Sequence, residues 1–221
     1  MGAAEYQLTA NVWIRGFLRD DYGVAPGDMR WLLGGLYQPG RIEKLAVTIQ
    51  GVEMQAIRPD QTLSQMLLDA ELDAVMGPRP PHGFPGPGVR RLFENFREVE
   101  ADYFKRTGVF PIMHTLVIRR DVLEHDAWIA RSLYDAFSES KRRAMTELSE
   151  PVVLWTTLPW QIAEVEATRA LMGDDYWPYG VEPNRTALEA LMRYSCEQGL
   201  AQHSVPLDSL FAANTLDDYR I

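Results

Sequence analysis

The chain has 221 residues, of which 46% are hydrophobic and 24% are charged, an ordinary composition for a globular protein with a packed core. The formal net charge of -9, with the only dense basic cluster at 141–143, argues against nucleic-acid binding, which requires many clustered cations. No apolar run approaches membrane-spanning length and the first residues do not resemble a signal peptide, so we expect a cytoplasmic protein that binds no membrane.

The sequence lacks the motifs that mark common metal and cofactor sites. Its single cysteine, Cys196, excludes an intramolecular disulfide, and no two histidines have the spacing of metal ligands on one helix or strand. The glycines at 34–35 and 83–88 fit neither the dinucleotide-binding nor the phosphate-binding loop pattern. We therefore predict no metal and expect no cofactor.

Short strands and helices alternate in the first half of the chain. Apolar residues over 8–21 recur at helical spacing, and Gly23 is suited to end that helix. Thr62 and Gln65 form a capping-box pattern at the start of a second helix, whose expected buried face includes Ala70. The other expected elements are strands over 29–33, 45–49, 52–57 and 73–76, a loop over 37–43 and a helix over 98–106.

A buried strand is predicted over 110–121. The apolar residues 116–118 follow turn signals and precede a return of charge, and His114 and Thr115 interrupt the apolar pattern. We expect this strand to carry the chain from one lobe to another, with a cleft where His114 lies.

The second half is predicted to be almost entirely helical. Expected helices lie over 127–149, 159–172 and 186–198, followed by a short turn over 208–211. These helices cannot form a sheet and need another surface to cover. We therefore predict an α/β lobe over residues 1–108, and over 109–221 the crossing strand with the mostly helical part of a second lobe.

Thr9 stands at the expected start of the first helix, with Tyr6 and Gln7 just before it. The free amides and the dipole of a helix start favour an anion, so this segment is suited to hold a carboxylate. The alternative interpretation is that Thr9 only caps the helix.

Arg79 follows the predicted strand over 73–76, in a proline- and glycine-rich loop that continues to Gly88. Ligands of α/β sheets bind outside the carboxyl ends of strands, and a guanidinium can hold a carboxylate at two points. We predict that Arg79 contacts an anionic ligand and that His82 also lines the site. The alternative is a surface arginine in a mobile loop.

His114 is the candidate acid–base residue. A histidine within an apolar strand needs a partner or a chemical role, and imidazole suits proton transfer near neutral pH. The alternative is a hydrogen-bonded core histidine, whereas His125 and His203 lie in polar surroundings and are given no role.

Trp177, Tyr179 and Arg185 form an aromatic and basic cluster in a proline-punctuated loop. Such residues can wall a flat ligand, and the alternative is that they pack the loop onto a helix.

Five parts of the sequence share their residues with one known family. They are Glu5–Trp13, Asp73–Arg79, Phe110–His114, Met172–Arg185, and Leu210-Phe-Ala with Thr215-Leu216. Through these segments, which span nearly the whole chain, the sequence resembles the 4,5-dihydroxyphthalate decarboxylase family. The Tyr-Trp-Pro-Tyr-Gly run that begins at Tyr176 is fairly specific to it.

The resemblance implies a fold similar to type II periplasmic binding proteins, in which two α/β lobes hold a ligand in the cleft between them. It also implies non-oxidative decarboxylation of 4,5-dihydroxyphthalate, or a related hydroxylated aromatic diacid, to protocatechuate and carbon dioxide. Our hypothesis for this reaction is that His114 supplies or relays the proton, while Arg79 and the helix start at Thr9 hold the carboxylates.

Two further expectations come with the resemblance. Many family members are labelled as solute-binding proteins of transporters, so the alternative function is binding of an organic anion without turnover. Family members usually carry a further segment before the part that matches Glu5-Tyr-Gln, which this sequence lacks. We therefore expect the second-half helices to expose apolar faces that favour self-association or a partner chain.

Overall fold

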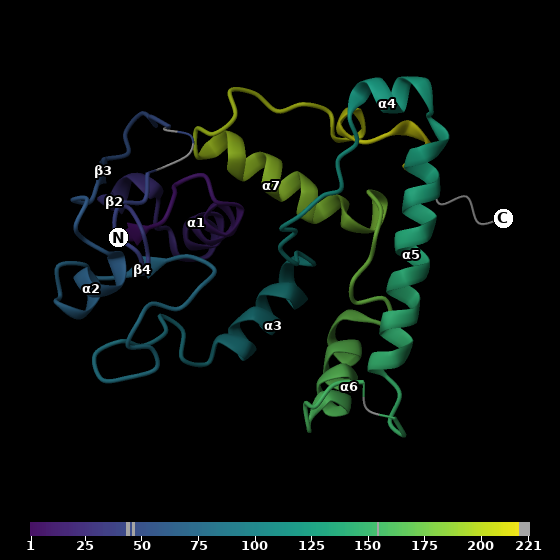
Figure 1. Cartoon of the computed structure of the whole chain (residues 1–221), viewed down its shortest axis with the longest axis horizontal. Helices are drawn as coiled ribbons and strands as arrows, with labels where there is room; N and C mark the ends of the chain where they lie inside the picture. The colour runs from purple at the N-terminus through teal and green to yellow at the C-terminus, as the bar shows by residue number, and fades with distance from the viewer. Residues whose placement is uncertain (43–44, 46, 154, 217–221) are drawn as a thin grey trace. The chain divides into compact units, whose positions relative to one another are not determined.

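The computed structural model describes residues 1–42, 45, 47–153 and 155–216, and its helices and strands are labelled in Figure 1. The chain forms two compact units. Unit 1 comprises Met1–Val99, Phe110–Met113 and Glu189–Ser204, and unit 2 comprises Glu100–Val109, His114–Leu188 and Val205–Ile221. Unit 1 is therefore assembled from three separate stretches of sequence.

Unit 1 is built on a parallel four-stranded sheet. Its strands are β1 (Gly2–Ala3), β2 (Trp31–Leu33), β3 (Met54–Ala56) and β4 (Val75–Met76), in the order β3-β2-β1-β4. All three pairings are parallel, and they align Gly2 with both Leu32 and Val75. The predicted α/β class is confirmed, and β2, β3 and β4 fall within three of the predicted strands.

Two parts of the strand prediction differ from the structure. The central strand β1 was not predicted, because two residues at the start of a chain carry no readable alternation. The strand predicted over 45–49 is wrong for the residues described there, which form no strand. Glu43 of the predicted loop and Ala46 of the predicted strand lie outside the described residues, as does Lys44 between them.

Helices cover the two faces of this sheet. Leu18, on α1 (Thr9–Tyr22), packs in one core with Trp31 and Leu33 of β2. Leu32, between them in sequence, packs on the opposite face against the core of α2 (Leu63–Leu68). This alternation is the period of two expected of a strand buried on both faces.

The helix ends follow local signals. Gly23 ends α1 in the left-handed conformation, with a φ of 68°. The Thr62 side chain accepts from the Gln65 amide at 3.3 Å, whereas the Gln65 side chain donates to Asp69 instead of returning to Thr62, so half of the predicted capping box forms. Ala70 is exposed and has a φ of 59°, so its expected place on the buried face of α2 is wrong, because the helix ends before it.

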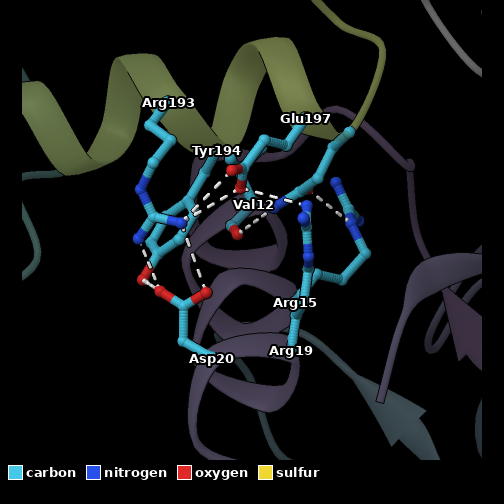
Figure 2. Close-up of polar contacts among 8 residues, drawn as sticks. Val12, Arg15, Arg19, Asp20, Arg193, Tyr194 and Glu197 are labelled. Carbon is cyan, nitrogen blue, oxygen red and sulfur yellow. Dashed lines mark hydrogen bonds and ion pairs between the residues drawn. The ribbon is translucent and has the colours of Figure 1, made fainter. Parts of the chain in front are cut away.

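The C-terminal part of α7 (Arg185–Glu197) packs on α1 through Tyr194 and a set of charged residues (Figure 2). Gly16 permits the contact, because a Cβ atom there would lie 2.4 Å from the Tyr194 ring. The Tyr194 hydroxyl and the Arg193 guanidinium both donate to Asp20, at 2.7 and 2.5 Å. The Arg193 hydrogen bond is the main cause that lowers the pKa of Asp20.

Unit 2 is helical and has few buried apolar residues. Its main elements are α4 (Arg120–His125), α5 (Trp128–Leu148) and α6 (Gln161–Met172), with most of α3 (Phe96–Thr107) and short 3₁₀ helices at Glu182–Asn184, Leu207–Leu210 and Ala213–Thr215. A further 3₁₀ turn, Pro26–Asp28, belongs to unit 1. The predicted helices are confirmed to within a few residues.

Large apolar side chains remain exposed in unit 2, among them Trp155, Leu158 and Trp160. No helix within the described residues has the length and apolar character needed to cross a membrane.

The buried strand predicted over 110–121 is wrong. Residues 110–119 have no regular secondary structure, the next residues begin α4, and Val117 is 86% exposed. An apolar run indicates a strand only if a neighbouring strand accepts and donates its backbone hydrogen bonds. None of the strands in the described residues pairs with this run.

The Asp20 contacts predict how stability depends on pH. Because the folded-state pKa of Asp20 is lowered, its contribution to stability is present above pH 3.8, its ordinary value, and is lost as the pH falls below that value. Asp20→Asn should lower the free energy of unfolding by about 1 kcal/mol at pH 7, since the pair is partly exposed. The deficit should vanish at the acid end of a series of urea titrations.

Asp60→Asn is the control, because it removes the carboxylate of an exposed ion pair with Arg58 whose atoms lie 3.4 Å apart. A deficit in Asp20→Asn that stays constant from neutral to acid pH would show that the carboxylate charge plays no part.

Candidate functional site

The strand order places one site candidate at the carboxyl edge of the unit 1 sheet. The chain runs from β1 through β2 to β3 on one side, and β4 then pairs with the other side of β1. Ligands of parallel sheets bind where the direction of strand succession reverses, outside the carboxyl ends of the strands on either side. The segments that leave β1 and β4 at this point carry the predicted residues Tyr6, Gln7, Thr9, Arg79 and His82.

Tyr6 is a core residue. It is fully buried, its ring meets the Trp31 ring edge-on at 5.5 Å, and the Arg15 guanidinium lies 3.7 Å above its centroid. Burial raises the pKa of the Tyr6 phenol. The side chain therefore packs in the core beneath the segment that leaves β1.

Thr9 is the first residue of α1 and does not cap it. Leu8 occupies the capping position, where no side chain accepts a hydrogen bond from the first turn, so the interpretation of Thr9 as a cap is wrong. The amide groups of a first turn have no partner within the helix. Anion binding at this end of α1 stays a prediction.

Gln7 lies beside an ion pair whose carboxylate, that of Glu5, is buried. Its Nε2 atom donates to the Leu45 carbonyl at 3.1 Å and lies 3.4 Å from one oxygen of Glu5. The other oxygen of Glu5 accepts from the Arg41 guanidinium. Glu5 and Arg41 are functional candidates that the sequence analysis did not find, because they are far apart in sequence and belong to no motif.

The loop after β2 contacts the loop after β4. The Tyr37 hydroxyl donates to the Pro80 carbonyl at 2.5 Å, and the Tyr37 ring meets the His82 ring at 4.7 Å. The His82 amide donates to the hydroxyl of Ser64, a fully buried residue of α2, at 3.1 Å. His82 is exposed but has a defined position, which its sequence surroundings did not indicate.

Arg79 is exposed and lies three residues after the end of β4, in the segment that contacts Tyr37 through Pro80. Among the described residues, no carboxylate forms an ion pair with it. A guanidinium in this position is available for an anionic ligand.

The remaining predicted residues belong to unit 2. His114 is exposed in the irregular segment before α4, so it is not the strand histidine that was expected. Trp177 is half exposed, and the Lys141 ammonium lies 5.0 Å from the Tyr179 ring. Arg185 pairs with Glu182 and, at 2.9 Å, with Asp208, and the hydrogen bond to Glu182 raises its pKa.

Comparison with known proteins decides the family. No family model matches the sequence. The chain is 37% identical over 224 residues to a 4,5-dihydroxyphthalate decarboxylase of Comamonas testosteroni, a match that covers all of this chain and 68% of that protein. It is 40% identical over 108 residues to a protein of the same name from Pseudomonas putida, covering 48% of this chain and 42% of the relative.

The chain belongs to the 4,5-dihydroxyphthalate decarboxylase family. The resemblance drawn from its sequence segments is thereby confirmed. Within this family member, the carboxyl edge of the unit 1 sheet gathers the cations Arg41 and Arg79 and the start of α1. A set of positive groups of this kind suits a ligand with carboxylates.

The contact between Tyr37 and Pro80 predicts how firmly the loop at 77–88 is held. Tyr37→Phe removes one hydrogen bond, worth about 1 kcal/mol, and should speed hydrogen exchange of the His82 amide about fivefold. Tyr22→Phe is the matched control, because the Tyr22 ring stacks on Phe93 elsewhere in unit 1. Equal exchange of the His82 amide in both variants would mean that Tyr37 does not hold the loop.

Proposed function

We propose that this chain catalyses the non-oxidative decarboxylation of 4,5-dihydroxyphthalate, or a related hydroxylated aromatic diacid, to protocatechuate and carbon dioxide. The similarity over the whole chain to a relative with that name supports the reaction. The structural observation that carries the proposal is Arg79, an exposed guanidinium without a carboxylate partner among the described residues, where the order of strands reverses.

The chemistry follows from the substrate. A ring hydroxyl para to a carboxylate gives up its proton to the solvent and donates electron density to the carbon that bears that carboxylate. An acid delivers a proton to this carbon, the bond to the carboxylate breaks, and its electron pair restores the aromatic ring as carbon dioxide leaves. The hydroxyl group that lost its proton regains one, so the product is protocatechuate.

The protein contributes position and charge. Arg79 and the first turn of α1, with Thr9 and Gln7, hold the carboxylates, so that the ring carbon meets the acid in a fixed orientation. His114 supplies the proton, and His82 lines the ligand near Arg79. Trp177, Tyr179 and Arg185 form part of the wall around the flat ring.

The proposal includes the fold of type II periplasmic binding proteins, with the ligand held between two lobes. Unit 1 supports this for one lobe, because it is a parallel sheet with a helix on each face. The division into an α/β lobe over residues 1–108 and a second lobe over residues 109–221 stays a prediction, and compact unit 1 also includes Phe110–Met113 and Glu189–Ser204. We propose a cytoplasmic location.

Product analysis tests the reaction. Purified protein incubated with 4,5-dihydroxyphthalate should release protocatechuate and carbon dioxide in equal amounts, measured by liquid chromatography and by trapped gas. Binding of the diacid without product would contradict the proposal and support the alternative of a binding module without turnover.

Histidine variants test the proton donor. His114→Gln should lower kcat by about 100-fold or more, the usual contribution of a positioned acid, and should leave KM within a few-fold of its original value. His125→Gln is the control, because His125 is also an exposed histidine of unit 2 and contacts only its neighbour Asp126 among the described residues. An unchanged kcat in His114→Gln would remove His114 from the reaction.

A further inference from the structure

The carboxylate of Glu5 is buried directly after the central strand β1. Its side chain is 8% exposed, and its main chain is also engaged, because the Asn11 side chain donates to the Glu5 carbonyl at 2.8 Å. A buried carboxylate is stable only if cations or hydrogen-bond donors compensate its charge. Arg41 and Gln7 provide those donors, one for each carboxylate oxygen.

The guanidinium of Arg41 is only partly used by this pair. A guanidinium has five N–H groups, and Arg41 donates to Glu5 through Nη2 alone. The side chain is 42% exposed, and no second acceptor for it occurs in the described part of the chain. Arg142 is used more fully, since it donates to both oxygens of Glu139 at 2.7 Å.

The loop that carries Arg41 contacts both segments that form the candidate site. It leaves β2 through Gly34 and Gly35, and a side chain at Gly35 would collide with the Gln38 carbonyl, so the loop turns sharply there. Arg41 joins the loop to Glu5, after β1, and Tyr37 joins it to Pro80, after β4. The loop thus connects the two segments between which the strand order reverses.

We propose that Arg41, positioned by Glu5, binds the second carboxylate of an aromatic diacid and makes the site selective for diacids over monoacids. Arg79 holds one carboxylate, and the unused N–H groups of Arg41 hold the other together with the first turn of α1. Glu5 is a positioning residue, because it fixes the orientation of the guanidinium and contacts no substrate. This inference rests on the proposed function for the class of ligand.

Titration calorimetry with two unreactive acids tests the proposal. Phthalate has two adjacent carboxylates but no ring hydroxyl to drive decarboxylation, and benzoate has one carboxylate. The unmodified protein should bind phthalate more tightly than benzoate. A variant without the Arg41 guanidinium loses one charge-assisted contact to the second carboxylate. It should bind phthalate about 10- to 100-fold more weakly and benzoate within about twofold of the unmodified protein.

Two variants keep the test independent of folding. Arg41→Gln alone would leave Glu5 buried without its cation, so the double variant Glu5→Gln with Arg41→Gln removes both charges together. Arg41→Lys keeps the charge for Glu5 but lacks the guanidinium fork, and should retain only part of the preference for phthalate. Arg58→Gln is the control, because Arg58 is an exposed arginine of the same unit that approaches Asp60.

Preserved preference for phthalate in the double variant would overturn the proposal, as would equal binding of the two acids, or binding of neither, by the unmodified protein. Selective phthalate binding that depends on Arg41, without protocatechuate from 4,5-dihydroxyphthalate, would sustain the role of Arg41 and refute the proposed reaction. The two proposals therefore fail separately.

Discussion

One buried guanidinium, that of Arg15, holds together three parts of unit 1. It donates to the Tyr6 carbonyl at 2.8 Å and to the Gln198 side chain at 2.7 Å, and the Gln198 amide donates to the Val12 carbonyl on α1. No carboxylate of the described residues pairs with Arg15, and burial lowers its pKa to about 10, so it remains charged at neutral pH. The Tyr6 ring beneath it offsets part of the cost of burying the charge. The segment that leaves β1, and with it the candidate site, is oriented by this contact.

Local signals predicted the helices of this fold well and its strands less well. Gly23 ends α1 as predicted, because a helix end depends on the residues next to it. A strand depends on its neighbours in the sheet. Gly2–Ala3 is a central strand because it pairs with β2 and β4. The apolar residues 116–118 pair with none of the described strands and therefore form no strand.

The candidate site shows the same limit. Arg79 was predicted from its position after a strand, and the strand order then placed it where ligands of parallel sheets bind. Glu5 and Arg41 were not predicted, since they are 36 residues apart and only the parallel pairing of β1 with β2 makes their loops neighbours. The position of His82 depends on Tyr37 and Ser64, and neither contact leaves a pattern in the sequence.

The composition of unit 1 from three stretches of chain has a consequence for its biosynthesis. Arg15 and Gln198 are separated by 183 residues, and the ribosome adds only about 5–20 residues each second. Synthesis of the residues between them therefore takes about ten seconds or more, and the contact between α1 and α7 cannot form before then. Premature termination ahead of Glu189 would yield a fragment without the last stretch of unit 1.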